Sequence, residues 1–371
     1  MPPDYLIIEP YLQDALQSRT LQAAFDLGII DVFTECAELP QSEVFRNRAC
    51  DAAGARFLVE VLSKAGVFRV TEQRIGLTPG FRDALRFREL LQTKLRFAEL
   101  VAPDFFSRLP QLLSSSEEFM STSKLFELFD YGRCHDVTPQ NCLQASRWMQ
   151  LTTMLTRYEA PVCCDHFAFD EHRRMLDLGG NSGEFALQAC RRTPALHATI
   201  ADLPVVCHVG ARHIAAFPEA ARIQFQPMHF IEDAFPGGHD LITCKSVLHD
   251  WPDSLVEVLV RKCFGSLPGG GRILIFERQL WDMSLHAMPY GLLPVLLFFR
   301  SYRRPEFYIT LLNAVGFTEV SVTTIQLEVP FMLVTGKASG RRESPDTVAG
   351  DTSAKSICPA SPVDRVRPAW A

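Results

Sequence analysis

The stretch MLDLGGNSGEFALQACRRTPALHATIAD, residues 175–202, decides the fold class of this chain. An apolar run leads into glycines, and a helical pattern then leads into a second apolar run that ends on Asp202. This order predicts a strand, a tight glycine turn, a helix and a second strand with an acid at its tip. Glycines let a backbone approach a ligand closely, and the acid can accept hydrogen bonds from a ribose diol. Gly179, Gly180, Gly183 and Asp202 therefore predict half of a binding site for a nucleoside cofactor.

The residues around this turn favour one class of cofactor. A nicotinamide dinucleotide would require glycine where Asn181 stands, and a helix start that is free to receive a pyrophosphate. Glu184 lies in the first helical turn and Asp177 at the strand end, so two carboxylates would repel a pyrophosphate and attract a cationic centre. S-adenosylmethionine carries a sulfonium and a ribose but no phosphate, so it is the favoured cofactor. A purely structural glycine turn would not specifically require the acid at Asp202.

Composition disfavours several other classes of protein. A chain of 371 residues is long enough for two domains, and 47% hydrophobic with 22% charged residues is ordinary for a globular enzyme. The net charge of -6 and the lack of a basic run disfavour nucleic-acid binding. The cysteines show no CxxC or His-Cys spacing for a metal, and Cys163 and Cys164 are adjacent. This usage predicts a reduced, cytoplasmic protein without a metal site.

No stretch predicts a targeting or membrane segment. The start, MPPDYLIIEPYLQD, lacks the basic region and apolar core of a signal peptide. The most apolar run, YGLLPVLLFF at residues 290–299, contains a proline and is too short to span a bilayer. We therefore expect this run in a core or in an apolar pocket.

Residues 12–85 predict a small helical module. The stretch LQAAFDLGIIDVF has apolar residues at helical spacing and breaks at Gly28, and a second helix over residues 55–65 ends at Gly66. VFRVTEQRIGLTP then alternates apolar and polar residues around a turn, as a β-hairpin does. Two helices followed by a hairpin indicate a winged helix, which in some proteins binds DNA. Because nothing basic crowds the second helix, packing or dimerisation is the favoured role.

The rest of the chain predicts helices and then an α/β domain. Residues 87–166 are helical in pattern, and the helix at residues 145–159, ASRWMQLTTMLTRYE, carries a methionine and aromatic stripe. Such a stripe is usually core, but its place before the cofactor turn leaves a role in a pocket wall open. Further strands are expected at residues 225–228, 240–247, 273–276, 320–325 and 331–335, with a helix at residues 254–267. The final segment, rich in Ser, Pro, Asp and Arg, predicts a disordered tail.

Two residues at the ends of neighbouring predicted strands suggest acid–base chemistry. His249 follows one parallel strand and Glu277 ends the next, so both are expected at the edge of the sheet where ligands bind. Histidine is a natural base near neutral pH, and a carboxylate can hold its ring in one tautomer. A lone histidine would more often be structural, but a His-Asp-Trp cluster beside a cofactor turn favours a functional role.

The motifs together resemble a known family. LDLGGNSGEFAL, ADLPVV, KSVLHDWPD, LPGGGRILIFE and LLNAVGF, with FDLGIIDVF, RFLVEVLSKAGVF and GLTP in the helical module, are similar to the S-adenosylmethionine-dependent O-methyltransferases. That family includes caffeic acid, isoflavone and acetylserotonin O-methyltransferases and bacterial polyketide and pigment methyltransferases. The resemblance implies an α/β fold, with a Rossmann-like class I methyltransferase domain and an N-terminal helical winged-helix dimerisation domain. The implied divisions are the winged-helix dimerisation domain at residues 1–100, the helical linker and pocket helices at 101–170, the methyltransferase domain at 171–338 and a tail at 339–371.

The resemblance also implies site residues. His249 matches the family's general base, and Glu277 matches one of two acids that flank it. The implied cofactor contacts are made by Asp177, Gly179, Gly180, Gly183, Asp202, Leu203, His229, Phe230, Lys245 and Trp251. The implied substrate contacts are made by Trp148, Met149, Thr153 and Asp250, and Met149 and Thr153 match a helix that touches both ligands. A small-molecule substrate and a homodimer are the implied partners.

Two stretches depart from the family pattern. The family commonly has a Gly-Asp pair after the third strand, whose acid contacts the adenine amino group, whereas this chain has Met228, His229 and Phe230. The second acid that flanks the histidine is expected near residues 302–304, where no acid aligns and Glu306 is off register. These departures put the adenine contact and the holding of the histidine in question.

The expected reaction is transfer of a methyl group to a substrate oxygen. A phenol with a pKa of ~10 is mostly protonated at neutral pH, so a base such as His249 is needed. Carbon or nitrogen methylation, a ligand sensor with a DNA-binding winged helix, and a structural dimer partner with an inactive site remain alternatives. The run at residues 291–299 suggests a large apolar acceptor, although the same run suits a dimer core.

Overall fold

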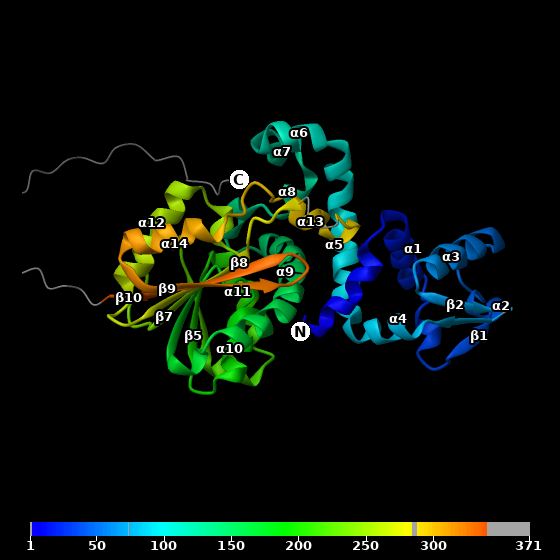
Figure 1. The fold of residues 1–371 in the computed structure, drawn as a ribbon, viewed down its shortest axis with the longest axis horizontal. Helices are drawn as coiled ribbons and strands as arrows, with labels where there is room; N and C mark the ends of the chain where they lie inside the picture. The colour runs from blue at the N-terminus through cyan, green and yellow to red at the C-terminus, as the bar shows by residue number, and fades with distance from the viewer. Residues whose placement is uncertain (1, 73, 284–287, 340–371) are drawn as a thin grey trace, which may run out of the picture.

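The computed structural model describes residues 2–72, 74–283 and 288–339 (Figure 1). A helical module formed by the first part of the chain lies at one end of the molecule, and an α/β domain lies at the other. Long helices in the middle of the chain lie between them. The predicted tail at residues 339–371 falls outside the described residues except for Ser339, so its predicted disorder stays a prediction.

The N-terminal module contains the predicted helix and hairpin. Helix α3 begins at Ala52, three residues before its predicted start, because the Asp51 carboxylate accepts a hydrogen bond from Gly54 N at 2.7 Å and caps the helix. The three strands of the module pair antiparallel in the order β1-β3-β2. The elements are η1 (Asp4–Leu12), α1 (Ala15–Asp26), η2 (Asp31–Phe33), β1 (Glu38–Pro40), α2 (Gln41–Val44), α3 (Ala52–Lys64), β2 (Phe68–Thr71), β3 (Arg74–Leu77), α4 (Pro79–Ala84) and η3 (Leu85–Phe87).

The middle of the chain is helical, as predicted. Helix α9 is longer than the predicted residues 145–159, because Thr138 accepts a hydrogen bond from Asn141 N at 3.1 Å and Pro139 suits the first helical position. The elements are α5 (Arg88–Ser107), α6 (Leu109–Ser114), α7 (Ser116–Thr122), α8 (Lys124–Leu128), η4 (Tyr131–His135), α9 (Pro139–His166) and η5 (Phe169–Glu171).

The α/β domain is built on a mixed seven-stranded sheet with the order β6-β5-β4-β7-β8-β10-β9. The first five strands in that order are parallel, and β10 is antiparallel to both of its neighbours. The predicted strands are present, most of them longer than predicted. They are β4 (Arg174–Leu178), β5 (His197–Asp202), β6 (Ile223–Pro227), β7 (Leu241–Lys245), β8 (Arg272–Arg278), β9 (Phe317–Gln326) and β10 (Pro330–Ala338).

Helices cover both faces of this sheet, which explains why its central strands are continuous apolar runs. Met175 of β4 packs with residues of α9 and α10, whereas the next residue, Leu176, packs with residues of α12 and α14 on the other face. The remaining helices are α10 (Glu184–Arg192), α11 (Pro204–Ile214), η6 (Pro218–Arg222), η7 (Leu248–Asp250), α12 (Asp253–Ser266), η9 (Tyr290–Leu292), α13 (Leu293–Leu296) and α14 (Pro305–Val315).

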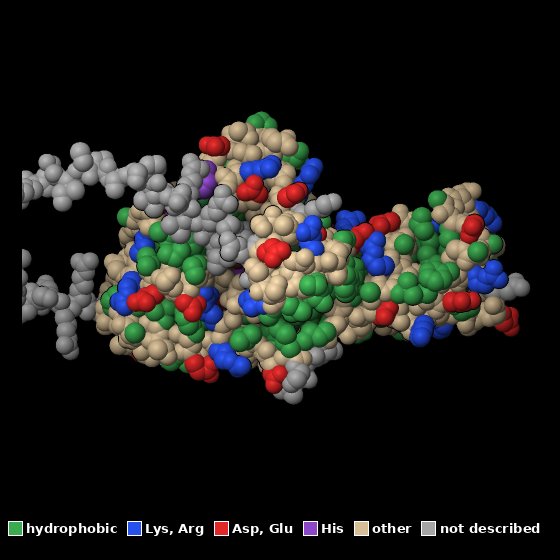
Figure 2. All heavy atoms as spheres, turned by 90° about the horizontal axis from the view of Figure 1, so that it is seen from above, with side chains coloured by type: hydrophobic (Ala, Val, Ile, Leu, Met, Phe, Trp, Pro, Cys, Tyr) green, Lys and Arg blue, Asp and Glu red, His purple; other side chains and the backbone are tan. Residues whose placement is uncertain are grey.

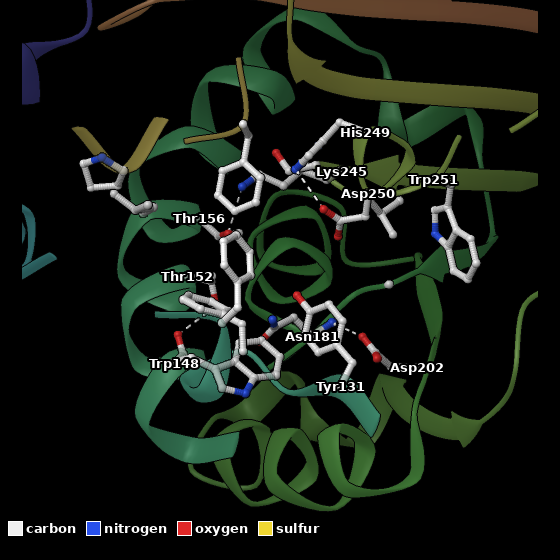
Figure 3. Close-up of a pocket in the computed structure, with 18 of the residues that line it drawn as sticks. Tyr131, Trp148, Thr152, Thr156, Asn181, Asp202, Lys245, His249, Asp250 and Trp251 are labelled. Carbon is white, nitrogen blue, oxygen red and sulfur yellow. Dashed lines mark hydrogen bonds and ion pairs between the residues drawn. The ribbon is translucent and has the colours of Figure 1, made fainter. Parts of the chain in front are cut away.

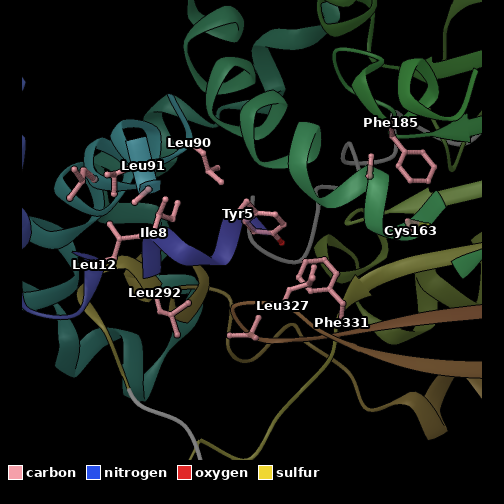
Figure 4. Packing of buried hydrophobic residues seen from close by; sticks show 14 of the residues in the cluster. Tyr5, Ile8, Leu12, Leu90, Leu91, Cys163, Phe185, Leu292, Leu327 and Phe331 are labelled. Carbon is pink, nitrogen blue, oxygen red and sulfur yellow. The ribbon is translucent and has the colours of Figure 1, made fainter. Parts of the chain in front are cut away.

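One hydrophobic cluster connects the module to the α/β domain (Figure 4). Tyr5, Ile8 and Leu12 of η1 belong to the same buried cluster as Leu90 of α5 and Phe331 of β10. Helix η1 is thus enclosed by elements of the N-terminal module and of the α/β domain. Within the described ranges, no helix is long and apolar enough to cross a membrane.

Candidate active site

A large cavity lies where the carboxyl ends of the parallel strands meet. Strands β5, β4, β7 and β8 are neighbours in the sheet, and the segments that follow them line a cavity of about 1760 Å³. Helix α9 forms one wall (Figure 3), and residues of α5, α7, α8, η4, η9 and α13 also belong to the lining. Ligands of open α/β sheets bind at this edge, so the topology supports a binding site here.

The turn after β4 presents its backbone to this cavity. Gly179 has φ +66°, a left-handed conformation that favours glycine. A Cβ on Gly180 would lie 2.6 Å from Asp177 Oδ2, so no side chain fits there. Asn181 N donates a hydrogen bond to Asp202 Oδ2 at 2.9 Å, which ties the turn to the tip of β5. The turn is therefore packed against its neighbours too closely for a side chain at Gly179 or Gly180.

Two buried carboxylates lie beside the turn. Burial raises the pKa of Asp177 to about 7, although a hydrogen bond from Thr243 Oγ1 at 2.6 Å opposes the shift. Asp177 Oδ2 is buried and has no hydrogen-bond partner among the described residues. Burial also raises the pKa of Asp202 to about 6, against the backbone amides of Asn181 and Leu203. Because burial disfavours their charged forms, both groups suit a ligand that carries positive charge.

His249 lies in η7, with a carboxylate near each ring nitrogen. Its Nε2 is 3.4 Å from Asp250 Oδ1, and its Nδ1 is 3.8 Å from Glu277 Oε1. The second separation is too long for a hydrogen bond, and Nδ1 has no such partner within the described part of the chain. Burial lowers the pKa of His249, but Asp250 and Glu277 outweigh burial, so the net pKa lies above its usual value. The two carboxylates thus favour the protonated ring.

Glu277 holds the backbone that carries His249. Its Oε1 accepts hydrogen bonds from Val247 N at 3.0 Å, Leu248 N at 2.6 Å and His249 N at 3.4 Å. Its Oε2 accepts a hydrogen bond from Tyr308 Oη at 2.8 Å. Glu277 is buried and does not line the cavity, so the structure makes it a positioning residue for the loop rather than a group that contacts a substrate.

Arg303 holds the same loop from the other side. Its Nη1 donates a hydrogen bond to Leu248 O at 3.0 Å, its Nη2 donates to Trp251 O, and its Nε donates to Asp253 Oδ1 at 2.8 Å. Arg303 stands where the sequence pattern expects the second flanking acid. In this chain the second carboxylate beside the imidazole is Asp250, the residue that follows it.

The comparisons with known proteins agree with this geometry. Residues 129–318 match the O-methyltransferase domain family model. Acetylserotonin O-methyltransferase of Bos taurus is 31% identical over 339 residues, which cover 85% of this chain and 93% of the relative. The structure of human N-acetylserotonin methyltransferase in complex with S-adenosylmethionine superposes with a TM-score of 0.69 at 22% identity, over 87% of this chain and 94% of that one. The chain belongs to the O-methyltransferase family. It is an S-adenosylmethionine-dependent O-methyltransferase.

A third relative matches only in part. The 3-hydroxy-5-methyl-1-naphthoate 3-O-methyltransferase of Streptomyces sahachiroi is 38% identical over 110 residues, which cover 30% of this chain and 32% of that relative. The match therefore supports the family, whereas the acceptor has to be argued from the cavity.

Most of the predicted site residues of the methyltransferase line the cavity. Predicted residues in the lining are Trp148, Asp177, Gly179, Gly180, Asp202, Leu203, His229, Phe230, Lys245, His249, Asp250 and Trp251. The structure does not bring Gly183, Met149, Thr153 or the carboxylate of Glu277 to it. All four lie outside the cavity lining, and Glu277 is buried at the end of β8.

Gly183 and Glu184 are the first correction. Gly183 has φ +82°, and a Cβ there would lie 2.6 Å from Ile200 and 2.9 Å from Ile214, so it faces the packing of the domain. Glu184 is buried with its carboxylate bound to His213 Nε2 at 2.9 Å. The expected repulsion of a pyrophosphate by Glu184 is therefore not supported, and the carboxylates in the cavity are those of Asp177 and Asp202.

The face of α9 is the second correction. Thr153 Oγ1 donates to Ser182 Oγ at 2.7 Å and Met149 is buried, and neither residue lines the cavity. The residues one step away, Thr152 and Thr156, line the cavity with Trp148 (Figure 3). They follow the spacing of four that one helical face requires, so the helical register was the available signal.

Two of the predicted cofactor contacts, Lys245 and His229, also have partners within the protein. The Lys245 ammonium points to α9, where it donates to Thr156 Oγ1 at 3.0 Å and forms an ion pair with Glu159. His229 lines the cavity, but its Nδ1 lies 3.4 Å from Glu232 N and accepts a hydrogen bond from it. Lys245 is thus already engaged elsewhere, and His229 has one ring nitrogen committed to its own loop.

Tyr131 was missed by sequence reasoning. It lies in η4, lines the cavity and is placed beside Asn181 and Asp202 in Figure 3. No motif surrounds it, so nothing in the local sequence marks it as a cavity residue. Across the described ranges, no group of three or more His, Cys, Asp or Glu side chains is arranged to hold a metal ion.

The corrected role of Gly183 predicts a difference in stability. Gly183→Ala is expected to lower the free energy of unfolding by about 2–5 kcal/mol, because a left-handed residue costs about 1–2 kcal/mol and overpacking about 1–3 kcal/mol. Gly238→Ala is the matched control, since Gly238 has φ +83° and no atom within 4 Å of its Cβ position. Urea denaturation should show only the backbone cost for the control. Equal losses would show that the neighbours of Gly183 move aside.

The hydrogen bonds of Glu277 predict a second difference. Glu277→Leu leaves buried backbone amides without an acceptor, at a cost of about 1–3 kcal/mol for each unsatisfied group, and should destabilise the protein by several kcal/mol. Tyr308→Phe removes only one hydroxyl donor and should cost about 1 kcal/mol. Thermal and urea unfolding measure both. A Glu277→Leu variant as stable as Tyr308→Phe would contradict the positioning role.

Proposed function

We propose that this protein methylates a hydroxyl group of a large, apolar, aromatic acceptor, with His249 as the general base. The observation that carries the proposal is the place of the His249 ring. It lines the same cavity as the glycine turn and Asp202 on one side and the apolar residues Leu292, Val295 and Phe298 on the other. A hydroxyl bound against the apolar wall would therefore meet both a base and the cofactor side of the cavity.

The residues of the cofactor side suit S-adenosylmethionine. Gly179 and Gly180 present backbone without side chains to the cavity, and the unpartnered Oδ2 of Asp177 and the carboxylate of Asp202 favour a ligand with positive charge. Asp202 can accept hydrogen bonds from ribose hydroxyls, and Trp251 can cover an aromatic ring. When bound, the cofactor supplies an electrophilic methyl group on sulfur.

His249 would accept the proton of the acceptor hydroxyl on Nε2, the nitrogen beside Asp250. A phenol with a pKa of ~10 is mostly protonated at neutral pH, so proton removal raises the population of the nucleophile. Asp250 and Glu277 would stabilise the imidazolium that results, which agrees with the raised pKa of His249. Positioning contributes as well, because the Glu277 and Arg303 hydrogen bonds hold the loop in one arrangement.

The cavity itself supports a large acceptor. A volume of about 1760 Å³ exceeds the ~300–1,000 Å³ that is usual for a small-molecule pocket, so it has room for a cofactor and a second ligand. Its apolar lining includes Phe97, Phe126, Phe129, Leu155, Leu292, Pro294, Val295 and Phe298. The run at residues 290–299 thus contributes to the cavity wall. The name of the Streptomyces relative specifies a hydroxynaphthoate, which is consistent with a fused-ring acceptor.

The base assignment predicts the behaviour of a His249→Gln variant. Its affinity for S-adenosylmethionine should be kept, because the glycine turn and Asp202 do not depend on the imidazole. Turnover should fall by about 10²- to 10⁴-fold, the usual contribution of acid–base catalysis. Acceptors are found by incubating the enzyme with labelled S-adenosylmethionine and extracts of its source organism, and calorimetry measures the cofactor affinity.

The pH profile provides an independent readout. Only the neutral ring accepts a proton, so wild-type activity should fall as pH drops through the pKa of His249. Because the neighbouring carboxylates raise that pKa, the fall should be centred above ~6.5. Raising the pH should partly rescue His249→Gln with a phenolic acceptor, which then ionises by itself. A variant with wild-type turnover at pH 7 would remove His249 from the reaction and favour carbon or nitrogen acceptors.

We also propose that the protein is a homodimer joined through the N-terminal module. Leu16, Phe57 and Val70 of this module are 56%, 51% and 43% exposed, and Figure 2 shows hydrophobic side chains gathered on one of its faces. Stable dimers often bury over ~2,000 Å², and an exposed apolar face of this kind is a common interface.

Light scattering should therefore give the mass of two chains at micromolar concentration. A variant with both Leu16→Glu and Phe57→Glu should shift the mass toward one chain, because charge is costly in an apolar interface. Val258→Glu, on α12 and 41% exposed, is the control that should leave the mass unchanged. A wild-type monomer would contradict the proposal.

A further inference from the structure

A group of buried charged residues lines the cavity beyond the region that the proposed reaction uses. Along α9, Trp148 packs against Tyr131 with 5.3 Å between the ring centroids, whereas Thr156, two turns further on, accepts a hydrogen bond from Lys245 (Figure 3). Past Thr156 the lining consists of Lys94, Glu159, Lys245, Arg278 and Glu328. Each of these side chains is at most 10% exposed.

This charged cluster is assembled from distant parts of the chain. Arg278 Nη2, at the end of β8, binds Glu159 Oε1 at 2.5 Å and Glu328 Oε1 at 3.0 Å. Lys245 forms an ion pair with Glu159, and both oxygens of that carboxylate are then engaged. Burial alone would raise the pKa of Glu159, but Arg278 and Lys245 hold it well below its usual value.

The positive and negative charges of the cluster are equal in number once Glu9, the partner of Lys94, is included. Lys94 Nζ, on α5, forms an ion pair with Glu9 Oε1 of η1 at 2.5 Å. Lys94, Lys245 and Arg278 are thus matched by Glu9, Glu159 and Glu328. A further buried charge would have no counterion in the cluster, and an unpaired buried charge is costly.

The hydrogen bonds, in contrast, do not balance. Arg278 Nε is buried and has no hydrogen-bond partner in the described structure, although Arg278 lines the cavity. Lys94 Nζ has three protons, and among the described residues Glu9 is the partner of only one of them. The cluster therefore has donor protons that no described residue accepts, those of Lys94 among them, and an acceptor oxygen of a ligand at this end of the cavity can bind them.

We propose that this cluster binds an uncharged carbonyl oxygen, of the ketone, quinone or amide type, at the end of the methyl acceptor that is remote from the reacting hydroxyl. The inference rests on the proposed function and adds the feature by which the acceptor is oriented. Tyr302 lies between the two regions: its ring centroid is 5.7 Å from that of His249, and Arg278 is close enough to oppose the effect of burial on its pKa. Hydrogen bonds from charged donors are stronger than neutral ones, so a single carbonyl can select an acceptor.

The experiment compares three probes that share a hydroxynaphthalene ring: 2-naphthol, 6-acetyl-2-naphthol and 6-hydroxy-2-naphthoate. Their affinities are measured by fluorescence titration with S-adenosylhomocysteine present, so that no methyl transfer is required. The wild-type protein should bind 6-acetyl-2-naphthol at least ten-fold more tightly than 2-naphthol. It should not prefer the carboxylate probe, because that probe adds an uncompensated charge.

Charge-balanced variants test the residues without leaving an unpaired ion. The pair Lys94→Met with Glu9→Gln, and separately the pair Arg278→Gln with Glu328→Gln, should reduce the acetyl preference to less than about three-fold. Lys337→Met with Glu319→Gln changes an exposed ion pair of 2.9 Å outside the cavity and should keep it. Circular dichroism and melting temperature confirm folding, and if the Arg278 pair does not fold, the Lys94 pair decides.

The outcomes separate this inference from the proposed function. A carbonyl preference without transfer of labelled methyl to any naphthol would contradict the proposed function alone. Methyl transfer with equal affinity for all three probes, or no binding of any of them, would overturn the inference. Tighter binding of the naphthoate than of the acetyl probe would overturn the uncharged class, and an unchanged preference in the folded variants would show that the cluster only joins the two parts of the chain.

Discussion

The active arrangement of this methyltransferase depends on one buried carboxylate. Glu277 ends β8, and its Oε1 accepts hydrogen bonds from the backbone of Val247, Leu248 and His249 in the loop that follows the neighbouring strand β7. A buried carboxylate that is bound by several amides is held firmly, because its alternatives cost desolvation without compensation. Arg303 binds the carbonyl of Leu248 from the other side, so the loop has little freedom. The imidazole is thereby placed without a hydrogen bond to its own Nδ1.

The cavity has three chemically different regions, and each region is lined by different elements of the fold. The turn after β4 and the tip of β5 provide backbone and carboxylates, η9 and α13 provide apolar side chains, and the outer end of α9 leads to ion pairs. Because the first helix of the chain contributes Glu9 to those ion pairs and Tyr5 to the hydrophobic cluster, the module is part of the site's support. A change in how the module packs would therefore reach the charged end of the cavity.

Sequence reasoning succeeded where a physical requirement is local. Apolar periodicity and backbone sterics predict the strands and the glycine turn that leads to Asp202. The topology of parallel sheets predicts that His249 and Glu277 lie at the ends of neighbouring strands. The structure confirms these elements, with small extensions where a cap such as Asp51 or Thr138 satisfies the first amides of a helix. The class of cofactor also followed from the residues around the turn, although Glu184 was not among the carboxylates that face the cavity.

Tertiary structure alone decided which face of each element meets the cavity. Thr152 and Thr156 of α9 meet the cavity in place of the predicted Met149 and Thr153, because helical spacing shows which residues share a face but only the packing decides which face meets the cavity. The ion pair of Lys245 with Glu159 and the backbone contacts of Glu277 also join residues that are far apart in the chain. Local sequence determines backbone conformation through short-range sterics and hydrophobic patterning, whereas the partners of a buried charge are determined only when distant segments pack and exclude water.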